Sequence, residues 1–248
     1  MELLAAVVAG TFIGGVLGFV GAGGAMLSVP ILINIFGFTP HHATTAALAI
    51  VFLAALAGAL PKMRENEVLY KDALIIWAIG LITNIGFSSF SENFSDTFIK
   101  AGFSIVLATA GLSMLRDPFT QIHKRIPPSI LILISLVIGA MTGIFGIGGG
   151  FLAIPVLVLF FGTPTNIAAG TSLLIISLNS LTALLARYGV WHEVNWHVPI
   201  VIGTAAVIVA TIASHRGSAS SPKHLRKGFA ILLLTISAFT FLQVLLQS

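Results

Sequence analysis

Two glycine-rich turns, 125 residues apart, hold the main-chain groups of this sequence that are best suited to bind a ligand. Each turn has the spacing G-x-x-x-G-x-x-G-x-G-G and is followed by a proline, from Gly14 to Pro30 in the first copy and from Gly139 to Pro155 in the second. Glycine allows positive φ and a close approach of the backbone, the geometry of an anion-binding nest. Free N–H groups at a helix start attract negative charge without a buried cation, so the turns favour an anion site.

Hydroxyl and amide side chains follow both turns and complete the predicted site. We expect the two turns and these side chains to surround a small anion. The predicted substrate-binding residues are Gly21, Gly23, Gly24, Thr44, Thr45, Gly146, Gly148, Gly149, Gly150, Thr171, Ser172 and Asn179. Two other interpretations compete with ligand contact: membrane-helix hydroxyls often bond to their own helix, and glycines four residues apart favour close helix packing. The packing interpretation is preferred for Gly10, Gly14, Gly18, Gly139 and Gly143.

The composition indicates an integral membrane protein. Hydrophobic residues make up 57% of the chain and charged residues 8%, with a mean hydropathy of +1.06. A soluble globular chain would carry about a quarter charged residues. Cysteine is absent, which excludes disulfides and thiolate metal sites. The twelve Lys and Arg residues lie in short loops, so the basic pI reports topology, and we expect a lipid bilayer as surroundings and no nucleic-acid partner.

Ten apolar stretches predict an all-α polytopic fold. Eight of them approach the roughly 20 residues that cross a bilayer, whereas 25–37 and 150–161 are too short and directly follow the glycine turns. We therefore expect about eight full spans and two broken or re-entrant glycine-rich hairpins around a polar cavity near mid-depth. The stretches are 3–20, 25–37, 43–60, 73–90, 97–115, 130–145, 150–161, 167–186, 198–214 and 228–246.

The duplicated turns divide a single transporter domain, 1–248, into internal repeats 1–122 and 123–248. Each repeat has five segments, and because that number is odd the second repeat is inserted upside down. Inverted repeats place a substrate site near the bilayer midplane at their interface. We therefore expect the first turn to enter from outside, the second from inside, and the two to meet near the middle.

Charge sets the predicted orientation. Ten of the twelve basic residues lie in the loops 61–72, 116–128 and 215–227, which the positive-inside rule makes cytoplasmic. Lys100 and Arg187 are then left outside, and both termini of this multi-pass protein are extracytoplasmic. Every Asp and Glu falls in a terminus, a loop or a segment end, so we expect no ionised side chain inside the membrane segments.

The glycine turns resemble those of the sulfite exporter TauE/SafE family. The second copy, Gly146–Pro155 followed by Ala168–Ser172, matches the family pattern closely. The first departs from it, because Ala25 replaces the third glycine and 43–47 lacks the Gly-Thr-Ser triplet. The resemblance covers essentially the whole chain. It implies an α-helical plasma-membrane permease for sulfite or organic sulfur anions, often directed outward.

These observations predict a secondary permease that exports a small sulfur-containing anion by alternating access. The inside-negative membrane potential supplies about 2.3 kcal/mol per charge per 100 mV, which drives an anion outward without a coupled ion. The alternatives are a carrier for another solute, such as a divalent metal ion, and a non-transporting membrane sensor or assembly protein. We expect no enzyme, because intramembrane protease motifs are absent, and no cofactor or metal. A homo-oligomer is compatible with the sequence.

Overall fold

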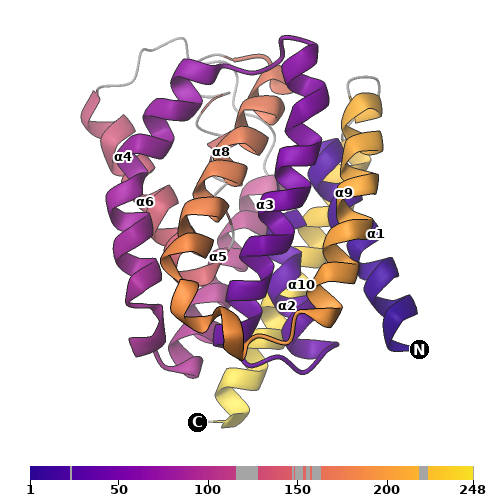
Figure 1. Ribbon diagram of the computed structural model, residues 1–248, viewed down its shortest axis with the longest axis vertical. Coiled ribbons are helices and arrows are strands. Elements are labelled where there is room, and N and C mark those ends of the chain that lie inside the picture. The colour runs from indigo at the N-terminus through magenta and orange to yellow at the C-terminus, as the bar shows by residue number, and fades with distance from the viewer. Residues whose placement is uncertain are drawn as a thin grey trace.

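The computed structural model describes residues 1–22, 24–115, 128–146, 148, 153–154, 157, 163–217 and 223–247. Within these ranges the regular elements are helices (Figure 1), which confirms the predicted all-α class. The helices are α1 Glu2–Val20, α2 Gly24–Asn34, α3 Pro40–Arg64, α4 Tyr70–Ser89, α5 Asp96–Leu115, α6 Pro128–Phe145, α8 Thr165–Ala186, α9 His197–Gly217 and α10 Lys223–Gln247, with 3-10 turns at Ser91–Asn93 and Tyr188–Glu193.

Five helices of the described ranges are long and apolar enough to cross a membrane. They cover Glu2–Val20, Pro40–Arg64, Tyr70–Ser89, Asn166–Ala186 and His197–His215. α2 has only 11 residues, about 16 Å of helix, so it fits the prediction of a short segment. The predicted segment 150–161 lies almost entirely outside the described residues, and the predicted total of eight spans stays a prediction.

α3 and α8 form the centre of the bundle (Figure 1). Within the 18-residue apolar stretch of each membrane-spanning candidate, 72% is buried in α3 and in α8, compared with 44% in α1 and α9 and 28% in α4. α3 packs against α8, α9 and α2, and α8 packs against α4. Small residues dominate α3, and in a membrane such residues let helix backbones approach closely and gain van der Waals contact.

Glycines bring two outer pairs of helices into close contact. α1 lies on α9, and a Cβ on Gly18 would be 2.6 Å from the carbonyl oxygen of Ala210. α6 lies on α4, and a Cβ on Gly143 would be 2.7 Å from the carbonyl oxygen of Asn84. Gly10, Gly14 and Gly139 have similarly close main-chain neighbours. The prediction that these glycines form packing faces is confirmed.

The first glycine turn reverses the chain. α1 ends at Val20, and the following residue, Gly21, has φ +74° and donates its N–H to the carbonyl of Leu17. α2 then runs back along α1, where a Cβ on Gly24 would touch Ile13 and Leu17. The two helices form a hairpin that returns to the end of the bundle where the chain begins. Both chain termini lie toward that end, and the α3–α4 connection lies at the other (Figure 1).

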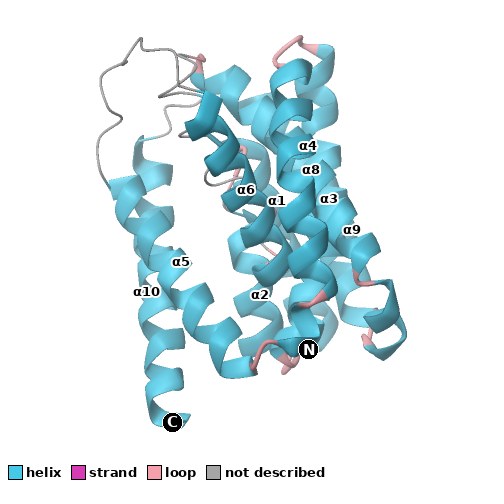
Figure 2. Cartoon of the chain, turned by 90° about the vertical axis from the view of Figure 1, so that its left-hand side faces the viewer, coloured by secondary structure: helices cyan, strands magenta, loops and turns pink. Residues whose placement is uncertain are grey.

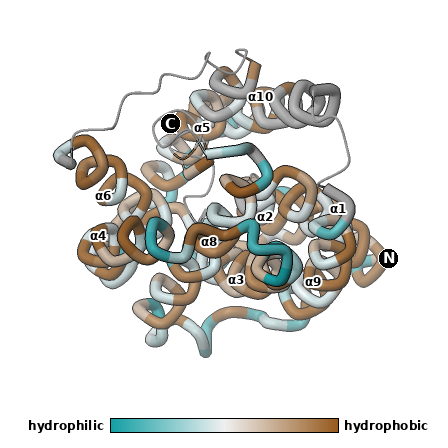
Figure 3. The backbone as a smooth tube through the Cα atoms, turned by 90° about the horizontal axis from the view of Figure 1, so that it is seen from above, coloured by the Kyte–Doolittle hydropathy of each residue, from teal (hydrophilic) through white to brown (hydrophobic). Residues whose placement is uncertain are grey.

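The periphery carries apolar side chains that face the surroundings. Ile82 is 78% exposed, Leu242 54% and Phe12 46%, an exposure that suits contact with lipid. α5 and α10 pack on each other at one side of the bundle (Figure 2). Viewed from above, the tube is largely hydrophobic along the helices, and much of its hydrophilic colour lies at helix ends and connections (Figure 3).

Two neighbouring glycines of α1 test the packing face. In Gly18→Ala the new methyl group meets the α9 backbone at 2.6 Å, so we expect a loss of about 1–3 kcal/mol of stability. In Gly15→Ala the nearest atom, on Val209, is 3.8 Å away, so alanine should stabilise the helix by about 0.5–1 kcal/mol. Melting temperatures in detergent measure both variants. Equal melting temperatures would contradict the packing role.

Candidate functional site

A buried arginine joins three helix ends. Arg187 follows the last residue of α8 and is only 3% exposed. Its Nη1 donates to the hydroxyl oxygens of Thr44 (2.7 Å) and Thr45 (3.3 Å), and its Nη2 donates to the carbonyl oxygens of Gly143 and Ile144. Those carbonyls belong to the last turn of α6, whose negative dipole end favours a cation. One guanidinium therefore connects the end of α8 to the start of α3 and the end of α6.

The structure corrects the prediction that no ionised side chain lies within a membrane segment, because Lys62 belongs to the candidate span Pro40–Arg64. The sequence analysis had placed Lys62 in a cytoplasmic loop and Arg187 in a weakly charged outer loop, and it did not predict that either side chain is buried. Both side chains are instead 3% exposed, and Lys62 lies inside α3. A charged group can be buried when oxygen atoms accept its hydrogen bonds. Here the oxygen atoms come from parts of the chain far away in sequence, which is why a local charge count did not reveal them.

The second glycine turn meets the first-half threonines. Gly146 has φ +68° and donates its N–H to the carbonyl of Thr142 at 3.0 Å. A Cβ at Gly146 would lie 2.6 Å from the carbonyl oxygen of Thr44. Thr44 and Thr45 are buried and donate their own hydroxyls to the carbonyl of His41 at 2.9 and 3.0 Å. Three predicted site residues, Gly146, Thr44 and Thr45, are therefore together.

A second polar cluster occupies the opposite end of α3 and α8. Lys62 Nζ pairs with Glu67 Oε2 at 2.6 Å, and Glu67 Oε1 accepts a hydrogen bond from Asn166 Nδ2 at 2.6 Å. Beside it, the N–H of Leu69 donates to Thr171 Oγ1 at 2.9 Å. The cluster connects the loop after α3 to the first two turns of α8.

The two clusters are far apart, so the predicted residues do not form one cage. Thr44 and Lys62 are 18 residues apart on α3, about 27 Å along a straight helix. Gly21 belongs to the Lys62 end, since a Cβ there would lie 2.6 Å from the Cβ of Ala169 near the start of α8. Gly21 and Gly146 therefore lie near opposite ends of the core helices. The expectation that the two turns meet near the middle does not hold for these residues.

The remaining predicted residues that the structure describes lie in α8, at the start of α2 and in the second glycine turn. Asn179 is buried in the second half of α8 and contacts Asn84 of α4. Gly148, with φ +72°, lies nearby, and a Cβ there would be 2.7 Å from Ile176 and 3.0 Å from Ser180. Ser172 is buried, and Gly24 packs on α1. Gly23, Gly149 and Gly150 lie outside the described residues.

Glu67 has a perturbed acidity. Burial by itself would raise the pKa of the Glu67 carboxyl, but the hydrogen bonds from Lys62 and Asn166 and the charge of Lys62 outweigh it and leave the pKa lowered from its ordinary 4.5. The carboxylate is therefore the form that this cluster stabilises.

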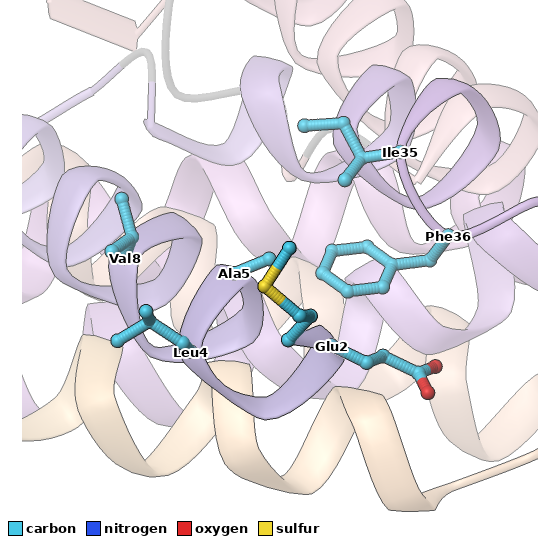
Figure 4. Close-up of a pocket in the computed structure, with 7 residues that line it drawn as sticks. Glu2, Leu4, Ala5, Val8, Ile35 and Phe36 are labelled. Atoms are coloured by element: carbon cyan, nitrogen blue, oxygen red, sulfur yellow. The ribbon is translucent and has the colours of Figure 1, made fainter.

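A hollow of about 560 Å³ lies at the start of α1, away from these clusters (Figure 4). Its lining is mostly apolar and includes none of the predicted site residues: Met1, Glu2, Leu4, Ala5, Val8, Ile35 and Phe36. We therefore do not regard it as the site. Within the described ranges there is also no group of three His, Asp or Glu side chains that could hold a metal ion.

Sequence reasoning missed Lys62 and Arg187, although a signal was present. The two residues are 125 positions apart, the same offset that relates the two glycine turns. Each copy of the duplicated pattern therefore carries one basic residue at the same place, and each of these residues is buried. Ser180, which lies beside Gly148, was also missed and gave no comparable signal, because the residue 125 positions earlier is Ala55.

Comparison with known proteins gives consistent matches over almost the whole chain. The sequence profile of the sulfite exporter TauE/SafE family matches residues 5–240. A "Probable membrane transporter protein" of Xylella fastidiosa is 29% identical over 96% of this chain and 94% of its own length. The proteins of the same description named YunE, from Bacillus subtilis, and MJ0441, from Methanocaldococcus jannaschii, are 28% and 27% identical, over 94% and 93% of this chain and 93% and 92% of theirs.

The lowered pKa of Glu67 predicts an acid sensitivity. As pH falls below about 4.5, the unfolded chain takes up a proton at Glu67 while the folded chain does not, so the stability contributed by this cluster decreases. Glu67→Gln lacks this titration. We expect the melting temperature of the wild type to fall more steeply than that of the variant between pH 5 and 3, by on the order of a few degrees. Parallel curves would contradict the assignment.

Proposed function

Because the chain belongs to the sulfite exporter TauE/SafE family of membrane transporters, we propose that it is a secondary permease for sulfite or another small sulfur-containing anion. In this proposal the substrate crosses the plasma (inner) membrane by alternating access between two inverted five-segment repeats, 1–122 and 123–248. The direction is outward, since the membrane potential drives an anion in that direction without a coupled ion.

Paired contacts support the inverted repeats. Gly21 touches Ala169 near the start of α8, and Gly146 touches Thr44 near the start of α3. Gly146 is 125 positions after Gly21, and Ala169 is 125 positions after Thr44. Each contact is therefore the repeat-related counterpart of the other. Two repeats related by a pseudo-two-fold axis in the membrane plane would produce this exchange. The helix pairs show the same relation: α1 of the first repeat packs through glycines on α9 of the second, and α6 of the second repeat packs through glycines on α4 of the first.

Polar contacts between the proposed repeats occur at both ends of the core. At one end Asn166 donates to Glu67, and at the other His42 Nε2 lies 3.5 Å from Glu193 Oε2. In each case the first turn of one core helix contacts the loop that follows the other. In alternating access, one of these ends would open while the other stays closed. By the positive-inside rule the Lys62 end would face the cytoplasm and both termini the outside.

The observation that carries the proposal is the pair of buried basic side chains, Lys62 and Arg187, at the two ends of one helix pair. Ionisable groups inside a membrane protein mark substrate or ion pathways by default. The guanidinium of Arg187 favours an anion and disfavours the alternative of a divalent-metal carrier, whereas the charge of Lys62 is balanced by Glu67. A non-transporting sensor or assembly protein is the remaining alternative, and a flux measurement separates it from a carrier.

Replacing Arg187 tests the anion pathway. We expect Arg187→Gln to lower sulfite efflux from proteoliposomes by about ten- to a hundredfold, because a charge-assisted hydrogen bond contributes about 1.5–3 kcal/mol. Arg187→Lys should retain more flux, and Arg64→Gln, at an exposed position at the end of α3, should resemble the wild type. Normal flux in a folded Arg187→Gln variant, or no flux of sulfite or sulfonates in the wild type, would contradict the proposal.

The natural absence of cysteine permits a direct test of alternating access. Cysteine pairs at Glu67 and Asn166, or at His42 and Glu193, allow a short thiol cross-linker to tie the proposed halves together at one end. Either cross-link should abolish flux, and reductive cleavage should restore it. The control pair, His41 and Asp96, lies 3.3 Å apart within the first proposed repeat and should leave flux intact. Flux that survives both inter-repeat cross-links would exclude the rocking mechanism.

A further inference from the structure

Two neighbouring residues in the second half of α8 carry hydrogen-bonding groups that no described residue satisfies. Asn179 and Ser180 are both fully buried. No described acceptor lies within hydrogen-bond reach of Asn179 Nδ2, and no described partner within reach of Ser180 Oγ. Leaving a buried polar group without a partner is costly, most of all in the apolar interior of a membrane protein. Trp77 Nε1 and Thr240 Oγ1 are also buried without a described partner, but Asn179 and Ser180 are consecutive residues and so offer two groups to one ligand.

The orientation of the Asn179 amide follows from its neighbour. Asn84 Nδ2 donates to the main-chain carbonyl of Asn179 at 2.9 Å, and a carbonyl can only accept. The same Nδ2 lies 3.1 Å from Asn179 Oδ1 and 2.8 Å from Thr182 Oγ1. The atom of Asn179 that faces Asn84 must therefore be the oxygen. Its NH2 group remains as a donor that the contact between α4 and α8 does not use.

The Gly148 turn lies next to Ser180. A Cβ on Gly148 would be 3.0 Å from Ser180 Oγ and 3.3 Å from Val51 of α3, so Gly148 itself lies close to both core helices. Gly148 has φ +72°, a conformation that glycine adopts without strain. A side chain at this position would fill the space beside the Ser180 hydroxyl. The backbone is thus brought close to one of the two unsatisfied groups.

This position lies halfway between the two charged clusters. Asn179 is eight residues from Thr171 at the Lys62 end and eight residues from Arg187 at the other, about 12 Å in each direction along the helix. The corresponding positions of α3, 125 residues earlier, are the buried Ala54 and Ala55. Of these two pairs of equivalent positions in the core helices, the pair in α8 is therefore the one with polar side chains.

We propose that Asn179 and Ser180, beside the Gly148 turn, form the mid-membrane binding site for a small oxyanion. The anion would accept hydrogen bonds from the Asn179 amide and the Ser180 hydroxyl, so neutral donors hold it between the charged clusters at either end. The inference rests on the proposed function and adds Ser180 to the predicted site. A site of this kind binds weakly enough to release its ligand, because neutral hydrogen bonds are weaker than those of a charged pair.

Ser180→Ala separates a binding role from a structural one. The change removes a hydroxyl that has no partner, so we expect a melting temperature equal to or above that of the wild type, together with roughly five- to tenfold weaker sulfite binding by calorimetry. Ser135→Ala is the matched control. Ser135 is equally buried but donates to its own helix at Leu131 (2.8 Å), so its loss should leave sulfite affinity unchanged.

Asn179→Asp provides a second variant of the same size. It replaces the donor with an acceptor that is negative when ionised, and should abolish sulfite binding. If the wild type binds sulfite and both folded variants bind it equally well, this inference is overturned while the proposed function stands. If Asn179→Asp does not fold, the affinity of Ser180→Ala decides alone. A wild type that neither binds nor transports sulfite would overturn both.

Discussion

A buried guanidinium must be surrounded by oxygen atoms, and this requirement decides how three helix ends meet in this protein. Arg187 contacts the hydroxyls of Thr44 and Thr45 and the last carbonyls of α6. The start of α3, the end of α8 and the turn at Gly146 are thereby held together. Since breaking a buried charged contact leaves an uncompensated charge, this end of the bundle can rearrange only if new partners replace the old ones.

At the opposite end of the core helices, a carboxylate is the partner of the buried cation. Lys62 pairs with Glu67, which also accepts a hydrogen bond from Asn166. Each cluster connects segments from both halves of the chain, and the core helices α3 and α8 run between them. Between the two ends, by contrast, Asn179 and Ser180 carry buried hydrogen-bonding groups that have no described partner. In our proposals, contacts within the chain hold the two ends of the core helices together, and the unsatisfied groups between them bind the substrate.

Glycine has two roles that sequence spacing alone only partly separates. Glycines at intervals of four in α1 and α6 let these helices touch α9 and α4. The spacing of these glycines was sufficient to predict that they form packing faces. Those in the turns adopt positive φ at Gly21, Gly146 and Gly148 and reverse or redirect the chain. Gly21 and Gly146 each lie against the start of the opposite core helix. They position the core helices, and among the turn glycines that the structure describes it is Gly148 that lies beside the unsatisfied groups.

Composition and periodicity by themselves determined the helical class, the helix bounds to within a few residues and the short second segment, because apolar length and Gly/Pro breaks are local properties. The family was also recognisable from the glycine turns. Which residues share a site was decided only by the tertiary structure. Thr44 and Thr171 each follow a glycine turn at a similar distance in the sequence, yet they lie at opposite ends of the core. Arg187 donates hydrogen bonds to main-chain carbonyls that are more than 40 residues away in the sequence. Burial and partnership are set by antiparallel packing of α3 on α8, which no local pattern encodes.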